Sequence, residues 1–323
     1  MGRTVQLVGI ARLATEGHML EEKRRVQYRS LPTRKWLTRC RSTRVPFHYT
    51  INPYRGCEFG CKYCYARFTH EFMERREADA FETDIYAKDL DVGSFRRELA
   101  HVKQGQVIGL GTATDPYQPA ERRFGRTRQI LEAMTMLRGT SLYLTTKSSL
   151  AGRDAGLLRR ISEHNRVVVT VSLITLDCDF ARLVEPYAPR PDLRLEVIRE
   201  LSSAGVSVGV IASPVLPLLT DSEENLQSVA TAAKQAGAEC FFAGVLFLKP
   251  AAQRTFFPFL EQHFPAHLRR YEINYCAGAY LRGEYPDRIA QLVCQIRERT
   301  GLASRTPCYV QPVAPPGGQL SLF

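Results

Sequence analysis

The chain has 323 residues, 44% hydrophobic and 24% charged, a composition typical of a folded protein with one large domain or two small ones. No apolar run reaches the ~18 residues that a membrane span requires, and the first residues lack the uninterrupted apolar segment of a signal peptide, so we expect a soluble cytoplasmic protein. Nine cysteines, an odd number, then predict reduced thiols rather than a disulfide framework.

Most of the positive charge lies in residues 1–45, which are predicted to form a basic N-terminal arm. This segment holds eleven Lys and Arg residues and three Glu, and so carries +8 of the formal net charge of +11. A basic arm is typical of proteins that bind nucleic acid, because lysine and arginine neutralise phosphates. A solvated lead-in without a ligand is the other interpretation, and the sequence leaves both open.

Six short apolar runs after the arm are predicted to be strands, with helical patterns between them. The strands are expected at His48–Asn52, Val107–Gly111, Ser141–Thr145, Val167–Ser172, Val206–Ala212 and Cys240–Leu246. The helices are expected at Tyr65–Arg76, Ala120–Leu137, Leu157–Glu163, Asp192–Ala204 and Glu223–Gln235. This alternation predicts an α/β fold with a parallel sheet, in the form of a partial (β/α)6 TIM-type barrel. A doubly wound sheet is the structural alternative, although the Gly109-Leu110-Gly111 run lacks the third glycine of its fingerprint.

Beyond Pro250 the pattern changes to helices, so residues 46–250 are predicted to form the barrel and residues 251–313 a helical C-terminal extension. The extension contains an apolar stripe at helical spacing, formed by Ile289, Leu292, Val293 and Ile296. Residues 314–323 begin with Ala-Pro-Pro-Gly-Gly and are predicted to form a flexible tail.

Three cysteines follow the first predicted strand at close spacing: Cys57, Cys61 and Cys64. Soft thiolates are preferred ligands of iron–sulfur clusters, and three of them leave one iron of a [4Fe-4S] cubane open to an external ligand. Gly56 and Gly60 let the backbone of this loop come close to the cluster. Zinc is the alternative, but it requires a fourth ligand, and the nearest histidine, His70, lies six residues beyond Cys64 on a predicted helix.

The arrangement Cys-x3-Cys-x-Tyr-Cys after a first barrel strand resembles the radical S-adenosylmethionine (SAM) superfamily. The resemblance covers residues 46–250 and implies an enzyme whose [4Fe-4S] cluster, held by the three cysteines, binds SAM through the open iron. It further implies that one electron, from a donor such as a flavodoxin or a ferredoxin, cleaves SAM to methionine and a 5′-deoxyadenosyl radical, which abstracts hydrogen from a substrate. Tyr63 is expected to lie against the adenine of SAM.

Polar residues follow several predicted strands, and in a barrel the carboxyl ends of the strands carry the active site. These segments resemble the DNA-repair branch of the superfamily, the spore photoproduct lyases and their relatives. The resemblance implies that SAM is held by Thr114, Lys147 and Ser172, where a lysine neutralises its carboxylate and hydroxyls bind ribose or carboxylate. Arg190 and Arg194 are further candidates for the carboxylate.

The resemblance to the lyases also bears on the catalytic residues. Tyr63 and Tyr65 match a tyrosine pair that relays the radical in the lyases. Thr112, however, stands where the lyases carry a hydrogen-donor cysteine, and its O–H bond is too strong for a hydroxyl to take over that transfer. We therefore expect a radical SAM enzyme of undetermined lyase or transferase type. Its substrate is unknown, and nucleic acid, in DNA repair or modification, is one candidate. A non-catalytic iron–sulfur or zinc protein that binds nucleic acid is the alternative.

The remaining cysteines and the chain's last five residues are the other candidate sites. Cys178 and Cys240 lie in apolar runs and are expected in the core. A second metal site would draw on Cys40, Cys276, Cys294 and Cys308. The sequence Gln319-Leu-Ser-Leu-Phe323 resembles the peptide by which bacterial replication and repair proteins bind the DNA sliding clamp. The alternative is that these apolar residues fold back onto the chain's own surface.

Overall fold

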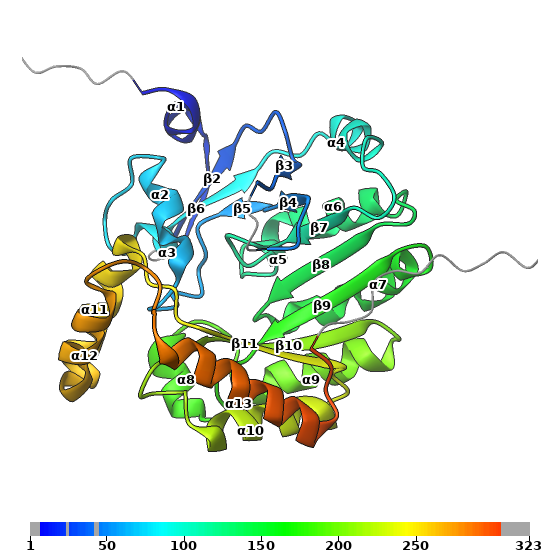
Figure 1. Cartoon of the computed structure of the whole chain (residues 1–323). Coiled ribbons are helices and arrows are strands. Elements are labelled where there is room, and N and C mark those ends of the chain that lie inside the picture. Colours follow the sequence, from blue (N-terminus) through cyan, green and yellow to red (C-terminus); the bar gives the residue numbers. More distant parts are fainter. Residues whose placement is uncertain (1–6, 24–25, 42–44, 305–323) are drawn as a thin grey trace, which may run out of the picture.

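The computed structural model describes residues 7–23, 26–41 and 45–304, and its centre is a seven-stranded sheet (Figure 1). The strand order is β11-β10-β9-β8-β7-β4-β3. These strands are β3 (Thr38–Arg39), β4 (Tyr49–Ile51), β7 (Val107–Leu110), β8 (Ser141–Thr146), β9 (Arg166–Ser172), β10 (Ser207–Val215) and β11 (Cys240–Val245). All neighbours from β4 to β11 are parallel, whereas β3 pairs with β4 in antiparallel orientation. The parallel strands coincide with the six that the sequence predicts, so the α/β class with a parallel sheet is confirmed.

The parallel sheet is stabilised by aliphatic side chains that are buried on both of its faces. In β9, every residue from Val167 to Ser172 is buried. Val169 lies opposite Leu144 of β8, and Val171 lies opposite Val210 of β10. Burying one such side chain contributes about 1.5–3 kcal/mol, and the main core joins these strands to the helices around them. This core positions the carboxyl edge of the sheet.

Helices surround the sheet, as the strand–helix alternation requires (Figure 1). They include α4 (Val92–Leu99), α6 (Arg126–Met134), α7 (Ala155–Ser162), α9 (Pro191–Ser203) and α10 (Glu223–Gln235). All but α4 overlap helices predicted from the sequence, and α10 has the predicted bounds. The helix predicted from Ala120 divides into α5 (Glu121–Phe124) and α6, because Gly125 between them adopts a left-handed conformation with a φ of 60°.

A second, four-stranded sheet contains part of the expected N-terminal arm (Figure 1). Its order is β1-β2-β6-β5, formed by β1 (Met19–Lys23), β2 (Val26–Leu31), β6 (Asp84–Lys88) and β5 (Tyr54–Arg55). β2 and β6 are parallel, and Tyr28 lies opposite Ile85, both fully buried. Helix α1 (Gly9–Glu16) packs against Leu31 of β2. Sequence analysis predicted neither this sheet nor α1, because it assigned the segment by its charge.

Trp36 ties the N-terminal segment to the main core. Its side chain is 2% exposed, and its ring lies 5.9 Å from the ring of Phe95 in α4. The backbone N–H groups of Trp36 and Leu37 donate hydrogen bonds to the carboxylate of Glu98, at 3.0 and 2.9 Å. The described part of residues 1–45 is thus built into the fold and is not a separate arm.

The C-terminal helices are α11 (Pro250–His263), α12 (Pro265–Tyr275) and α13 (Glu284–Thr300). Helix α13 packs against α10 and β11 and buries Ile289, Val293 and Ile296 in the main core, with Leu292 partly buried beside them, as the apolar stripe predicted. The described residues beyond Pro250 therefore share the core of the preceding part of the chain. No described helix is long and apolar enough to cross a membrane. The expected tail lies outside the described residues.

Candidate functional site

The three motif cysteines lie on one loop (residues 56–64), here called the cysteine loop, which follows β4 and β5 at the carboxyl edge of the central sheet. Cys57 and Cys61 are each 8% exposed, and Cys64 is half-buried. All three thiols are free. The chain then continues into η1 (Tyr65–Arg67) and α2 (Phe68–Glu71), which together are shorter than the helix predicted there.

Two glycines give the cysteine loop its shape. Gly56 has a φ of 78°, and a Cβ at this position would lie 2.8 Å from the carbonyl oxygen of Asp84 in β6. Gly60 has a φ of 63°, and a Cβ there would lie 3.0 Å from the ring of Tyr187. Residues with a side chain are strained at both positions, so the loop can follow this course only with glycine.

Strand β2, in the expected N-terminal arm, contacts the cysteine loop through a hydrogen bond. The hydroxyl of Tyr28 in β2 donates a hydrogen bond of 2.8 Å to Oε2 of Glu58, which lies next to Cys57. The backbone N–H of Glu58 donates in turn to Oε1 of Gln118, at 3.0 Å. The N-terminal segment therefore helps to position the loop.

The chemistry of the cysteine loop fits a [4Fe-4S] cluster. Burial raises the pKa of the Cys57 thiol well above its usual range, and it raises that of Cys61 to about 12 although Lys147 opposes the shift. Cluster binding would release these thiol protons. Within the described ranges, no three His, Cys, Asp or Glu side chains form a group that could hold a metal ion. A cubane requires a different arrangement, because each of its cysteines binds a different iron.

His70, the histidine nearest to the cysteine motif, is held elsewhere. Its side chain is 2% exposed, and its Nε2 lies 2.9 Å from the carbonyl oxygen of Asp84. Its ring packs edge-on against Phe81 and Tyr86, with centroids 5.2 and 6.1 Å away. Because a carbonyl oxygen only accepts, the neutral ring carries its proton on Nε2. Burial lowers the pKa of His70 to about 4.

Acid is therefore expected to destabilise the protein through His70. Between pH 6.5 and pH 4 the unfolded chain binds a proton that the folded chain excludes, so the free energy of unfolding falls as pH decreases through this window. The expected loss between pH 7 and pH 5 is about 2 kcal/mol. Urea unfolding at both pH values measures it. The His70→Gln protein serves as the control, and the same loss in that protein would contradict this origin.

Glu185 is the centre of a buried charged network beside the cysteine loop. It follows α8 (Cys178–Val184) and is 1% exposed. Its Oε2 lies 2.5 Å from Nη2 of Arg194, and its Oε1 lies 3.8 Å from Nζ of Lys147. The hydroxyl of Tyr63 donates a hydrogen bond to Oε1. Burial alone would raise the pKa of Glu185, but the two cations lower it below its usual value, so the carboxylate stays ionised.

Ser172, at the end of β9, carries a buried hydroxyl without a hydrogen-bond partner among the described residues. Its carbonyl oxygen accepts a hydrogen bond of 3.0 Å from Nη1 of Arg194, which joins Ser172 to the Glu185 network. Leaving a buried hydroxyl unpaired costs about 1–3 kcal/mol, and a bound polar ligand would recover this free energy. The orphaned hydroxyl therefore fits the role that the resemblance implies for Ser172.

Arg190, which was expected to bind SAM, lies outside this network. Its guanidinium pairs with Asp192 at 2.7 Å, and the two side chains are 55% and 47% exposed. Arg194, about one helical turn further along, is 1% exposed and pairs with Glu185. Of the two arginine candidates, the structure thus brings Arg194 to the site, because Arg194 lies on the buried face of α9, whereas Arg190 is the exposed N-cap residue of that helix.

Thr114 and Asp115 stabilise the candidate site through hydrogen bonds to the cysteine loop and to Lys147. The hydroxyl of Thr114 donates to the carbonyl oxygen of Gly56 at 2.5 Å and accepts from Nε2 of Gln118 at 2.8 Å. The carboxylate of Asp115 accepts a hydrogen bond of 2.7 Å from the backbone N–H of Lys147. Thr114 is therefore satisfied within the protein, and its contact with SAM stays a prediction.

Tyr63 and Tyr65, the expected radical relay, lie in different environments. Tyr63 is 5% exposed, whereas Tyr65 is 41% exposed. The hydroxyl of Tyr65 donates to the carbonyl oxygen of Thr112, whose own hydroxyl oxygen lies 3.2 Å from Nδ2 of Asn52. Tyr65 thus contacts the residue that is expected at the position of the lyases' hydrogen-donor cysteine, and both this correspondence and the relay stay predictions.

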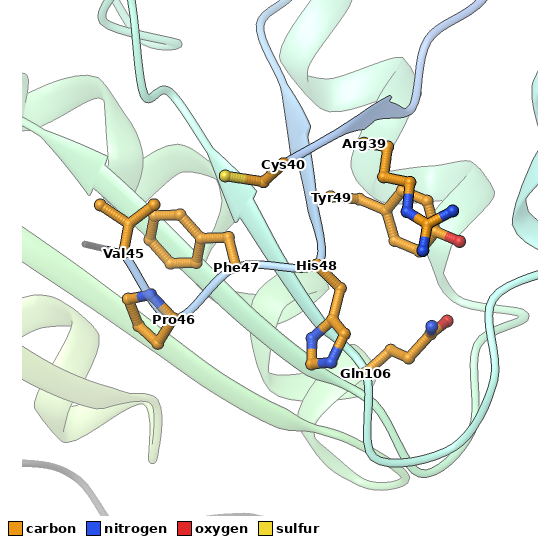
Figure 2. Close-up of a pocket in the computed structure, with 8 residues that line it drawn as sticks. All are labelled: Arg39, Cys40, Val45, Pro46, Phe47, His48, Tyr49 and Gln106. Atoms are coloured by element: carbon orange, nitrogen blue, oxygen red, sulfur yellow. The ribbon is translucent and has the colours of Figure 1, made fainter. Parts of the chain in front are cut away.

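A cavity of about 330 Å³ lies at the opposite, amino edge of the central sheet (Figure 2). It is lined by Arg39, Cys40, Val45, Pro46, Phe47, His48, Tyr49 and Gln106. Tyr49 begins β4 and Gln106 precedes β7, so this cavity and the cysteine loop lie at opposite ends of the same strands. The cavity therefore takes no part in the candidate site.

The other cysteines do not extend the candidate site. Cys40 borders the cavity at the amino edge, Cys276 and Cys294 are exposed after α12 and on α13, and Cys308 lies outside the described residues. Cys240 is buried in the core, as expected. The expectation for Cys178 was wrong: it is exposed at the start of α8, because the buried run that begins in β9 ends before it.

A model of the radical SAM superfamily matches residues 51–229 of this chain. An uncharacterised protein of Mycobacterium tuberculosis is 35% identical over 258 residues, which cover 78% of this chain and 76% of that protein. An uncharacterised protein of Methanocaldococcus jannaschii is 28% identical over 252 residues, which cover 78% of this chain and 88% of that protein. The family match contains the cysteine loop, Lys147, Ser172 and Glu185.

Two solved structures share this fold. A spore photoproduct lyase complexed with dinucleoside spore photoproduct superposes with a TM-score of 0.64 at 15% identity, covering 84% of this chain and 79% of the other. A variant of that lyase with bound AdoMet and the same dinucleoside superposes with a TM-score of 0.60 at 16% identity, covering 82% and 76%. At such identity the likeness concerns the fold alone.

Proposed function

Because this chain belongs to the radical SAM superfamily and is an enzyme of that class, we propose that it holds a [4Fe-4S] cluster on Cys57, Cys61 and Cys64 and cleaves SAM reductively. The six parallel strands, with helices around them, support a partial (β/α)6 barrel as its fold. When bound, the cluster supplies the electron that splits SAM into methionine and a 5′-deoxyadenosyl radical. A flavodoxin or a ferredoxin is the proposed electron donor.

The observation that carries this proposal is the buried network beside the cysteine loop. Nζ of Lys147 lies 5.7 Å from the ring centroid of Tyr63 in the cysteine loop, and its ammonium can neutralise the carboxylate of SAM. Ser172 has an unpaired hydroxyl for a second polar group of SAM. Glu185 holds Lys147 and Tyr63 in place, so that Tyr63 stays in position beside the adenine.

Anaerobic purification followed by reduction tests the proposed function. We expect a brown protein whose iron and sulfide approach four of each per chain and which forms 5′-deoxyadenosine from SAM after reduction with dithionite. Liquid chromatography measures the nucleoside. A colourless protein that binds one zinc ion and forms no 5′-deoxyadenosine would overturn the proposal.

DNA is the proposed substrate class, in repair or modification. Two features support it: the basic segment 1–45 and the clamp-type sequence at residues 319–323, which lies outside the described residues. Thr112 does not supply a hydrogen atom, so another donor has to complete the reaction.

Purified sliding clamp should bind the full chain and not a chain that lacks residues 319–323, and equal binding would contradict the clamp contact.

Neutralising the exposed pair Arg34 and Lys35 is expected to weaken DNA binding. The pair is suited to this test because truncation of the segment would also remove Tyr28, which supports the cysteine loop. Changing both residues to Gln should lower the slope of log K against log salt by about one to two units, because each lost phosphate contact releases one counterion fewer. Binding titrations at several salt concentrations measure the slope. The matched control is the exposed pair Arg159 and Arg160 on α7, and an equal change there would contradict a role for the segment.

A further inference from the structure

Aromatic rings and one lysine form a connected surface beside the cysteine loop, here called the aromatic rim. Its members are Tyr65, Phe68, Phe247, Lys249 and Tyr280. The ring of Phe247 is central, since its centroid lies 4.3 Å from that of Tyr280, in a stacked arrangement, and 6.0 Å from that of Tyr65. Nζ of Lys249 lies 3.4 Å from the ring centroid of Phe68 and 5.8 Å from that of Phe247.

The aromatic rim lies at the same edge of the sheet as the candidate site. Tyr65 follows Cys64 directly, and Phe247 and Lys249 follow the carboxyl end of β11. Tyr280 joins them through an antiparallel backbone bridge to Phe247. A substrate that reacts beside the cysteine loop has to approach this edge, so the rim lies on its path.

Two rings of the aromatic rim are open to solvent, and its one charged member is Lys249. Tyr65 and Tyr280 are 41% and 48% exposed. In the part of the chain that the structure describes, no carboxylate forms an ion pair with Lys249, whereas the exposed Arg254 nearby pairs with Glu71. The cation–π contacts hold the ammonium of Lys249 over apolar rings and leave its charge available to an anion.

We propose that the aromatic rim binds an unpaired base of single-stranded DNA, with the base stacked on the exposed ring of Tyr280, which Phe247 supports from its other face, and a neighbouring phosphate at Lys249. This inference rests on the proposed function, because it assigns the surface that presents DNA to the same site. Stacking needs an accessible π-face, which a base in a duplex does not offer. An acidic peptide would use the lysine without the rings, and an apolar peptide would use the rings without the lysine.

Fluorescence anisotropy with a labelled single-stranded DNA oligonucleotide tests the aromatic rim. The Tyr280→Leu protein should bind about 10-fold more weakly, the usual effect of losing one base-stacking ring. The Phe247→Leu protein should also bind more weakly, because it lacks the ring on which Tyr280 is stacked. The matched control is Phe47→Leu, because Phe47 also forms a ring pair, with Tyr143 at 6.2 Å, but at the amino edge. The Lys249→Met protein should lose about 0.7 of a unit of salt slope, and Lys234→Met, whose lysine bonds the carbonyl oxygen of Gly301, should lose none.

The melting temperature and iron content of each variant verify that it is folded. Unchanged binding by folded Phe247→Leu and Tyr280→Leu proteins would overturn the inference. Duplex DNA or RNA of the same sequence that binds more tightly than the single-stranded DNA would overturn it too. Duplex DNA offers no unpaired base, and RNA would be a different ligand. Formation of 5′-deoxyadenosine by the unmodified chain without DNA is measured in parallel. If no 5′-deoxyadenosine forms but DNA binding still depends on the aromatic rim, the proposed function is refuted while the assignment of the rim as a DNA-binding surface holds.

Discussion

The Cys61→Ala protein is expected to lose most of its iron and all reductive cleavage of SAM. A cubane held by three cysteines has no spare protein ligand, so removing one leaves a second iron without a thiolate. Cys61 also lies two residues before Tyr63, whose ring centroid is 5.7 Å from Nζ of Lys147 and whose hydroxyl donates a hydrogen bond to Glu185, so it is close to the proposed SAM contacts. Iron and sulfide analysis, the visible absorption spectrum and the yield of 5′-deoxyadenosine measure the effect.

Cys294→Ala is the matched control for this experiment. Cys294 is exposed on α13, which packs against α10 and β11. Its replacement should leave iron and cleavage unchanged. Full iron and full cleavage in the Cys61→Ala protein would show that the cysteine loop does not hold the cluster.

The Glu185→Gln protein is expected to unfold more easily, by about 3 kcal/mol. The change removes the charge that compensates the buried Arg194 and the partly buried Lys147, and breaking a buried ion pair from one side costs about 3–5 kcal/mol. Lys147 and Tyr63 also lose their common partner, so the affinity for SAM should fall together with the free energy of unfolding. Urea unfolding and SAM binding by calorimetry measure the two effects.

A double-mutant cycle shows whether the loss arises from the ion pair. Combining Glu185→Gln with Arg194→Met should cost at least about 1 kcal/mol less than the sum of the single changes, because the second change removes the unpaired cation. The control cycle combines Asp192→Asn with Arg190→Met, whose effects should be close to additive because solvent screens this exposed pair. Additive effects at Glu185 and Arg194 would contradict the network.

Much of the central sheet could be predicted because its signals are local. Each parallel strand is a short run of branched aliphatic residues between turn signals, and Val167–Ser172 is buried along its whole length as such a run predicts. The stripe on α13 repeats at helical spacing, so its buried face could be read directly. The second sheet escaped prediction because β1 and β2 lie in the segment judged by charge, and β5 is only two residues long.

The candidate cluster ligands were predictable for the same reason. Cys57, Cys61 and Cys64 lie within eight residues of one another, so one loop carries all three wherever the chain folds. Lys147 and Ser172 were found through the resemblance to the lyases, which places both at the ends of predicted strands. Their positions required only the rule that parallel strands share a carboxyl edge.

By itself, the sequence determined the class of the fold, the cysteine loop and the edge of the sheet at which the site lies. Only the tertiary structure decided which charged groups meet there. Tyr63 and Glu185 lie 122 residues apart, and no local pattern marks their contact. Arg190 and Arg194 look equivalent in sequence, but Arg190, the N-cap residue of α9, is exposed, whereas Arg194, within the helix, is buried against Glu185. Buried charges are paired by packing between distant segments, and that packing depends on the whole core, whereas spacing along the chain reports only on neighbours.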